Sequence, residues 1–154
     1  MHKLDSTDRS LLRLLQEDST RTIKQLAAEL NLTNTPVYER IKRLEKAGII
    51  ERYRAEVNAE KIGKELLVFT HVSLKEHSKE YLHNFEQKVQ ALPEVIECYH
   101  VSGEHDYLLR VLVANMQGYR TFLTEKLSKI KNLGNVHSSF VMEPIKKDRI
   151  IDPD

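Results

Sequence analysis

Five side chains of the kinds that bind metals or transfer protons lie within one short stretch. They are Cys98, His100, Glu104, His105 and Asp106. Thiolates, imidazoles and carboxylates are the usual zinc ligands. Their spacing matches no zinc-binding motif, and in a strand Tyr99 would point to the opposite face from its two neighbours. We therefore keep zinc binding as an alternative and expect no metal site.

Motifs for catalysis or cofactor binding are absent from the sequence. It contains no Gly-x-Ser-x-Gly, no phosphate-binding P-loop and no Gly-x-Gly-x-x-Gly. The paired carboxylates Asp5 and Asp8 belong to the start of a helix, and Glu143 and Asp148 lie among the last residues. We expect neither an enzyme nor a bound cofactor.

Basic side chains gather between Thr35 and Arg54. This stretch holds six Lys and Arg residues against three Glu residues, although the net charge of the whole chain is only +1. A local basic face on a nearly neutral chain is what a phosphate-contacting module needs. A solvated helix face with no partner is the alternative reading of the same charges.

Two helices are expected before residue 31. Asp5 can cap a helix from about Ser6 to Gln16, with Asp8 favourably placed in its first turn. Thr22 can cap a second helix, whose apolar face holds Ile23, Leu26, Ala27 and Leu30.

A third helix is expected to begin near Thr33. Pro36 suits its first turn and Gly48 its end. Val37, Ile41 and Leu44 recur at helical spacing and form an inner stripe, so the opposite side is polar. The segment Ile49–Val57 alternates loosely, as an exposed strand would.

Two short helices joined by a few residues, the second opening with small polar residues, are typical of a winged helix-turn-helix that reads DNA. The candidate DNA-binding residues are Thr33, Asn34, Thr35, Tyr38, Glu39, Arg40, Lys42, Arg43 and Lys46. Asn34, Thr35 and Tyr38 are placed to touch base edges, and Lys42, Arg43 and Lys46 to contact phosphates. A small helical bundle that does not bind DNA is the alternative.

The pattern of apolar residues changes after a polar linker at residues 55–65. Strands are expected at 66–75, 95–101, 107–113 and 136–143, with helices at 78–91 and 116–130. This β-α-β-β-α-β order favours a ferredoxin-like α+β sandwich in residues 66–154. We therefore expect an α+β chain with a DNA-binding domain at 1–54, a linker and an effector-binding and oligomerisation domain.

The sequence resembles the leucine-responsive and asparagine regulator (Lrp/AsnC) family. The resemblance is carried by the opening Leu4-Asp5 with Asp8-Arg9, by Leu26-Ala27 with Leu30, by Leu32 through Val37, by Arg40 through Glu45 with Gly48-Ile49-Ile50, and by Val101 through Tyr107. It covers nearly the whole chain. It implies that the first domain binds double-stranded DNA and that the second dimerises by pairing sheets. It also implies that dimers assemble further, commonly into octamers.

The same resemblance implies that a small effector, usually an amino acid, binds near Gly103 and Asp106. From the residues alone, Gly103 permits a backbone turn, and Asp106 can receive an α-ammonium group. A plain hairpin turn is the alternative. The candidate effector-binding residues are Val101, Ser102, Gly103, His105, Asp106, Tyr107, Val136 and Ser138.

Composition favours a cytoplasmic protein, and the resemblance implies that this is a prokaryotic cytoplasm and that the protein associates with the nucleoid. No run of 18 apolar residues is present to cross a membrane, the N-terminus has no apolar signal-peptide core, and Cys98 is the single cysteine. We expect a sequence-specific transcriptional regulator whose assembly or DNA affinity responds to an amino acid. A ferredoxin-like enzyme and a DNA-organising protein without an effector are the alternatives.

Overall fold

A computed structural model describes residues 3–147 and 150–153 of the chain. The chain divides into two compact units, and each is described by itself below. The first contains the described residues up to Glu56 together with those from Lys146 onward, and the second is Val57–Ile145. Residues 146–154 are expected from the sequence in the second domain, whereas the structure groups the described part of this segment with the first unit.

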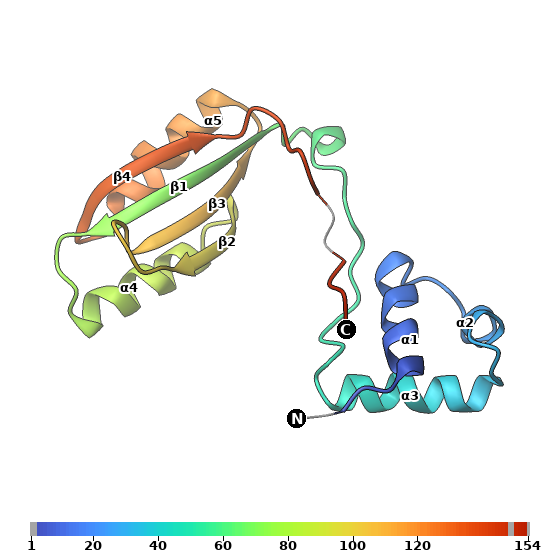
Figure 1. The fold of residues 1–154 in the computed structure, drawn as a ribbon. Helices are drawn as coiled ribbons and strands as arrows, with labels where there is room; N and C mark the ends of the chain where they lie inside the picture. The colour runs from blue at the N-terminus through green and yellow to red at the C-terminus, as the bar shows by residue number, and fades with distance from the viewer. Residues whose placement is uncertain (1–2, 148–149, 154) are drawn as a thin grey trace. The chain divides into compact units, whose positions relative to one another are not determined.

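The first unit is built on three helices, α1 (Ser6–Glu17), α2 (Ile23–Glu29) and α3 (Asn34–Lys46), as Figure 1 shows. The caps expected at Asp5 and Thr22 are both present, and each forms a reciprocal capping box, with Asp8 and Gln25 respectively. Thr33 occupies the cap position of α3 but makes no side-chain capping bond.

One apolar core holds these helices together. Leu11 of α1, Leu26 of α2 and the α3 stripe of Val37, Ile41 and Leu44 are all buried in it. The stripe predicted for the third helix is therefore confirmed, and it fixes which side of α3 faces outward.

The exposed strand predicted for Ile49–Val57 does not form. Gly48 takes a left-handed conformation (φ +69°) and ends the helix, and the main-chain N–H groups of Ile49 and Ile50 then bond back to the carbonyl of Leu44. No other strand lies within the described part of this unit, and a strand needs a partner to satisfy its main chain.

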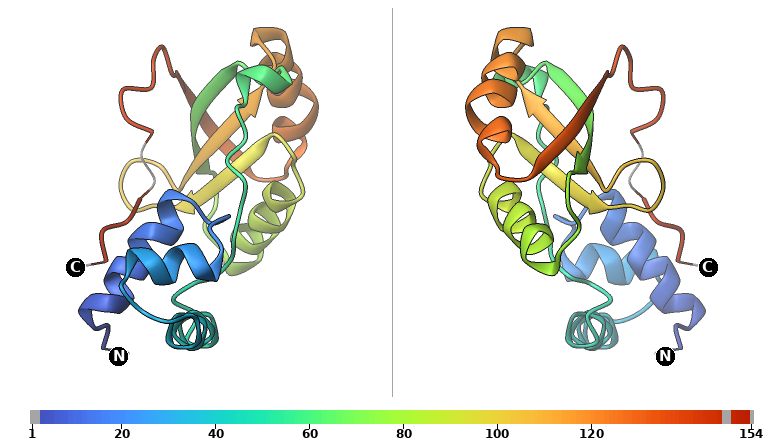
Figure 2. Two further views of the ribbon diagram at one scale, coloured as in Figure 1. Left: turned by 90° about the vertical axis from the view of Figure 1, so that its right-hand side faces the viewer. Right: turned by 90° about the vertical axis from the view of Figure 1, so that its left-hand side faces the viewer.

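The second unit is a four-stranded antiparallel sheet with helices on one face (Figure 2). After a short turn of 3₁₀ helix, η1 (Glu60–Ile62), the order is β1 (Leu66–Leu74), α4 (Lys79–Gln90), β2 (Val95–His100), β3 (Tyr107–Val113), α5 (Met116–Thr121) and β4 (Leu133–Phe140). The strands lie in the order β2-β3-β1-β4. The ferredoxin-like sandwich predicted from the sequence is confirmed.

The end of this unit differs from the prediction in two ways. The helix expected at 116–130 is regular only to Thr121 and continues as a wider turn, η2 (Phe122–Lys126), and a 3₁₀ turn, η3 (Leu127–Lys129). The last strand begins three residues earlier than expected. Gly134 belongs to this strand because its Cα approaches β1 closely, and a Cβ there would lie 2.7 Å from the carbonyl oxygen of Ser73.

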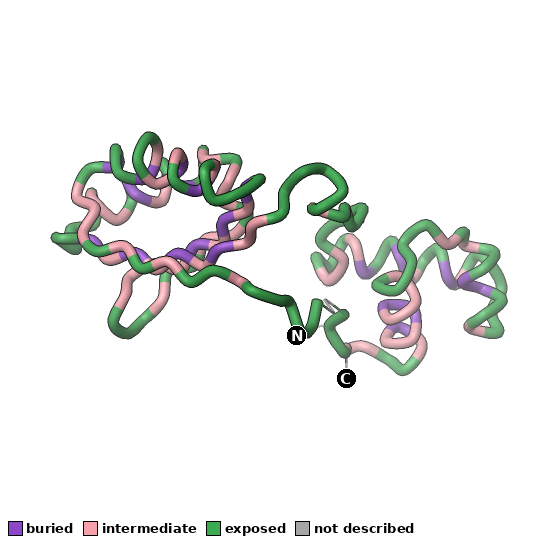
Figure 3. Tube along the Cα trace, turned by 90° about the horizontal axis from the view of Figure 1, so that it is seen from above, coloured by how far each residue is buried: buried purple, intermediate pink, exposed green. Residues whose placement is uncertain are grey.

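The core of the second unit lies between the sheet and its helices, as the buried segments in Figure 3 show. Alternate residues of β3, from Tyr107 to Val113, are buried in it. Thr70 is also buried, and its hydroxyl joins the Tyr119 hydroxyl at 2.8 Å, which in turn meets the Ser138 hydroxyl at 2.6 Å. These contacts satisfy polar groups inside the layer.

Candidate DNA-binding face and effector turn

The outer side of α3 presents the residues that the sequence proposes for DNA. All nine are exposed except Arg40, which is half-buried. Thr33, Asn34 and Thr35 lie at the start of the helix, where side chains can reach base edges. Tyr38 lies one turn further on with half of its surface exposed, and the Lys42 ammonium is 5.7 Å from the centre of its ring.

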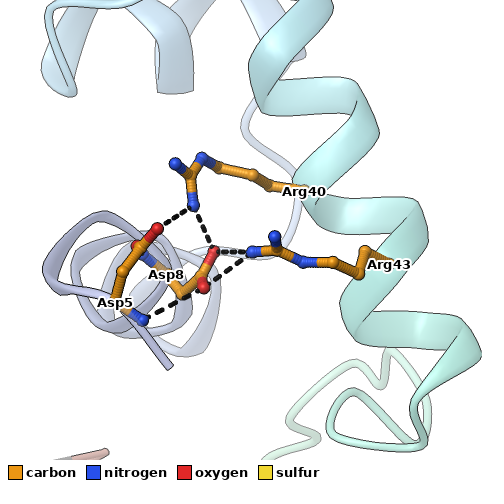
Figure 4. Close-up of polar contacts among 4 residues, drawn as sticks. All are labelled: Asp5, Asp8, Arg40 and Arg43. Carbon is orange, nitrogen blue, oxygen red and sulfur yellow. Dashed lines mark hydrogen bonds and ion pairs between the residues drawn. The ribbon is translucent and has the colours of Figure 1, made fainter. Parts of the chain in front are cut away.

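Two arginines of α3 are tied to α1 by a buried carboxylate (Figure 4). The Asp8 side chain is only 2% exposed. It accepts a hydrogen bond from Arg40 Nη1 at 2.7 Å, and Arg43 Nη2 bonds to both of its oxygens at 2.6 and 2.7 Å. This carboxylate therefore fixes the position of α3 against α1.

Asp5 completes this cluster from the cap of α1. Its carboxylate accepts from Arg40 Nη1 at 2.6 Å and from the main-chain N–H of Asp8 at 2.7 Å. These two bonds, the main-chain one first, lower the pKa of Asp5. The four side chains of Asp5, Asp8, Arg40 and Arg43 are called the α1–α3 clamp below.

The C-terminal half of α3 contains a second ion pair. Lys42 Nζ lies 2.7 Å from Glu45 Oε2, and the Tyr53 hydroxyl donates to Glu45 Oε1 at 3.0 Å. Burial and this hydrogen bond raise the pKa of Tyr53 to about 12. The segment after α3 is therefore anchored to the helix, although it forms no strand.

Lys46 differs from the other basic residues of this face. Within the described residues its side chain forms no hydrogen bond or ion pair, and it is exposed in the last turn of α3. Its ammonium group is thus available to a phosphate without breaking any internal contact.

In the second unit, the candidate effector residues from Val101 to Asp106 form the turn between β2 and β3. Ser102 and Gly103 are exposed, and Gly103 has a φ of +131°, a conformation that side-chain-bearing residues rarely adopt. The turn is closed by the N–H of Val101, which bonds to the carbonyl of Asp106 at 2.8 Å. We call residues Val101–Asp106 the effector turn.

Asp106 holds this turn against the end of β1. Its Oδ2 accepts from the N–H of Leu74 at 2.7 Å, and its Oδ1 lies 2.9 Å from His77 Nε2. Burial by itself would raise the pKa of Asp106, but the bonds from Leu74 and His77 outweigh it and lower the pKa. Asp106 is therefore an anionic group that remains 22% exposed.

The other candidates of the effector site lie in different surroundings. The ring of His105 lies 5.0 Å from that of His71 and 5.8 Å from that of His137. Tyr107 is 1% exposed in the core and donates to Glu86. Val136 and Ser138 face the helix layer, since Val136 packs on the core and Ser138 bonds to Tyr119. The structure therefore groups only the turn residues at the surface.

Cys98, His100, Glu104, His105 and Asp106 do not form a metal site in the structure. Among the described residues, no three His, Cys, Asp or Glu side chains lie close enough together to hold a metal ion. His100 stacks on Tyr107 instead, with ring centres 4.8 Å apart, and burial raises the pKa of Cys98 to about 11. None of the helices in the described ranges combines the length and hydrophobicity that crossing a membrane requires.

Two family models cover nearly the whole chain. Residues 4–51 match a winged helix-turn-helix DNA-binding model, and residues 67–151 match the Lrp/AsnC ligand binding domain. The chain belongs to the Lrp/AsnC family. It is accordingly a DNA-binding transcriptional regulator with a ligand-binding unit, and not an enzyme.

Individual Lrp/AsnC relatives agree with this assignment over nearly their full lengths. The chain is 43% identical to the DNA-binding transcriptional activator DecR of Escherichia coli, over 93% of this chain and 94% of the relative. An AsnC family regulator from Agrobacterium tumefaciens has a similar structure, with 38% identity, a TM-score of 0.91 and 96% of each chain covered. A regulator from Neisseria meningitidis, solved in complex with L-Met, has 33% identity and a TM-score of 0.90 over 94% of this chain and 93% of that one.

Several contacts of these sites were not anticipated from the sequence. The clamp partners of Arg40 and Arg43 were assigned only to helix capping, and His77, which holds Asp106, was not considered. The one available signal was the capping box itself, because it places Asp8 on the first turn of α1 with its carboxylate near the cap. Which helix would cross that turn is a property of the tertiary fold.

Proposed function

We propose that this Lrp/AsnC regulator reads specific DNA sequences with α3 and changes its assembly or DNA affinity when an amino acid binds at the effector turn. The observation that carries the DNA part is the face of α3. Eight candidate residues are exposed, and four of them lie opposite the buried stripe: Thr35, Glu39, Lys42 and Lys46. A helix with this division can enter the major groove without losing its own packing.

The contacts on DNA divide by chemistry. Asn34, Thr35 and Tyr38 supply side chains for base edges, whereas Lys42 and Lys46 supply charges for phosphates. Arg43 contributes one nitrogen to Asp8, so its remaining N–H donors can face a phosphate. Arg40 likewise bonds to Asp5 and Asp8 through one nitrogen, Nη1, which supports a mixed role in packing and backbone contact.

The effector part is supported by the chemistry of the turn. A carboxylate has about four lone-pair sites, and Leu74 and His77 leave room on Asp106 for an α-ammonium group. Gly103 leaves the backbone of the turn open, with nothing within 4 Å of where its Cβ would be. The L-Met complex of the Neisseria relative supports an amino acid as the class of ligand.

Assembly and location complete the proposal. Copies of the chain form dimers that assemble further to an octamer, as the family resemblance implies, and a dimer would favour a pseudo-palindromic site. A regulator of this kind acts where the DNA is, so association with the nucleoid in a prokaryotic cytoplasm follows from the proposal.

The proposed effector site is tested by removing the negative charge of Asp106 while keeping the shape of its side chain. We expect Asp106→Asn to weaken amino acid binding roughly ten- to a hundredfold, because a charge-assisted hydrogen bond contributes about 1.5–3 kcal/mol. Isothermal titration calorimetry would measure this, with L-methionine first and then the other nineteen amino acids. Melting temperature would show that the variant is folded.

Glu104→Gln is the matched control, since Glu104 is an exposed carboxylate of the same turn with no side-chain bond among the described residues. It should leave affinity unchanged. Equal losses in both variants would argue against direct recognition by Asp106. An absence of heat with every amino acid would favour a DNA-organising protein that has no amino acid effector.

A further inference from the structure

Residues 150–153 lie along α1, at the opposite end of the sequence (Figure 2). The Gln16 amide bonds twice to one main-chain residue. Its Nε2 donates to the carbonyl of Ile151 at 2.9 Å, and its Oε1 accepts from the N–H of Ile151 at 2.8 Å. Such paired bonds imitate those of a β-ladder and fix the register of the segment on the helix.

Two arginines on the same face of α1 extend this contact. Arg13 Nη2 lies 2.9 Å from Asp152 Oδ1, and Arg9 Nε donates to the carbonyl of Pro153 at 3.3 Å. Positions 9, 13 and 16 are spaced by four and three residues, so they form one row along the helix. Three successive residues of the segment thus meet three successive positions of the row.

The segment also borders an apolar groove of the first unit. The groove has a volume of about 700 Å³, and its walls include Leu12 and Leu15 of α1, Ile50, and Pro153 of the segment. Pro153 is half-buried there, whereas Ile151 is 75% exposed and contributes chiefly through its main chain. The contact is therefore mainly one of hydrogen bonds and charge, with Pro153 at the groove.

We propose that residues 150–153 are an intramolecular strap that completes the DNA-binding unit, so that this unit is tied to the ligand-binding unit at two points of the chain. The first tie is the chain that follows Glu56, and the second is the strap, which continues from β4. Because α1 carries Asp5 and Asp8 of the α1–α3 clamp, a strap on α1 also supports the position of the DNA-reading helix. This inference does not depend on the amino acid effector.

The energetic test is a double-mutant cycle in the full chain. Gln16→Ala and a truncation after Lys147 should each lower the melting temperature of the DNA-binding unit by a few degrees, which corresponds to roughly 1 kcal/mol. When the two changes are combined, the melting temperature should fall no further than with the truncation alone, because the Gln16 amide has then already lost its partner. DNA affinity should follow the same pattern, with a loss in each single variant and no further loss when they are combined. Additive losses would overturn the strap.

Gln117→Ala is the matched control, because Gln117 is an exposed glutamine of α5 whose side chain has no hydrogen bond among the described residues. It should have no effect in either background. A truncation that leaves melting temperature and DNA affinity unchanged would also overturn the proposal.

Cross-linking tests whether the strap docks on its own chain. Arg13→Cys with Asp152→Cys, in a Cys98→Ala background, places two thiols where the ion pair lies. A short bismaleimide should join them within one chain, so the denatured protein keeps the monomer mass and yields one peptide linking positions 13 and 152. A product of dimer mass would show exchange between copies, and no linked peptide would show no docking. Either result contradicts the proposal.

Discussion

We expect Asp8→Ala to lower the free energy of unfolding of the DNA-binding unit by about 2–3 kcal/mol. Asp8 is almost fully buried and receives three bonds from two guanidinium groups. Its removal also deletes the acceptor for the Asp5 N–H in the capping box, which contributes to the loss. Urea unfolding, with hydrogen exchange of peptides from α1 to α3 as the local readout, would measure the change.

The size of this effect follows from what remains after the substitution. Breaking a fully buried ion pair costs about 3–5 kcal/mol because a charge is left without a partner or water. Here the arginine side chains are 25% and 45% exposed, so both can recover part of their hydration. The expected loss is therefore below that range but well above that of a surface pair.

Glu17→Ala is the control for this prediction. Glu17 pairs with Arg21 at 3.1 Å and is 51% exposed, so its loss should cost no more than about 0.5 kcal/mol. Asp8→Asn removes the negative charge but keeps the capping hydrogen bond, since the amide oxygen can still accept from the Asp5 N–H. It therefore shows how much of the loss is due to the charge. If Asp8→Ala cost as little as Glu17→Ala, the clamp would not be what positions α3.

The second large effect is expected on DNA binding. Lys46→Ala should weaken binding to all sequences alike, roughly tenfold at low salt, and should reduce the slope of log affinity against log salt by about one per chain bound. Lys46 has no internal partner among the described residues, so its substitution removes a phosphate contact without changing the fold. Fluorescence anisotropy over a salt series would measure both quantities.

Lys88→Ala is the corresponding control, because Lys88 is an exposed lysine in the last turn of α4 and its loss changes the net charge equally. Its salt slope should match that of the unmodified protein. Lys42→Ala should have a smaller effect than Lys46→Ala, since Lys42 is already paired with Glu45. Identical slopes for Lys46→Ala and the unmodified protein would contradict a phosphate role for Lys46.

Local signals in the sequence were sufficient for the DNA-binding unit. Asp5, Thr22 and Gly48 mark helix ends through interactions with residues a few positions away, and the structure confirms all three. The failed strand at Ile49–Val57 shows the limit of such signals. Alternation of side chains describes a surface, but a strand also needs a neighbour, and no neighbour is present in the described residues of this unit.

In the second unit, the order of elements was predictable but the start of the last strand was not. The expected helix ends at residue 130 and the expected strand begins at residue 136, so Gly134 falls in the connection between them. The structure uses it where β4 passes the main chain of Ser73, a contact between residues far apart in the sequence. Asn132, with a φ of +65°, provides the left-handed turn instead.

The candidate sites show the same division between local and distant information. The polar face of α3 follows from helical periodicity and was predicted residue by residue. Its connection to Asp8, and the docking of residues 150–153 on Gln16, join positions 32 to 135 residues apart. No periodicity or spacing in the chain indicates such contacts, because they depend on how whole elements pack.

The central claim, that α3 reads DNA sequence, is tested most directly by selecting bound duplexes from a random library with the unmodified protein and with Thr35→Ala. We predict that the unmodified protein enriches a pseudo-palindromic site, and that Thr35→Ala loses its preference at one or two base pairs of each half-site while keeping the others. If no sequence is enriched, or if both proteins enrich the same site with the same base preferences, the reading role of α3 is contradicted.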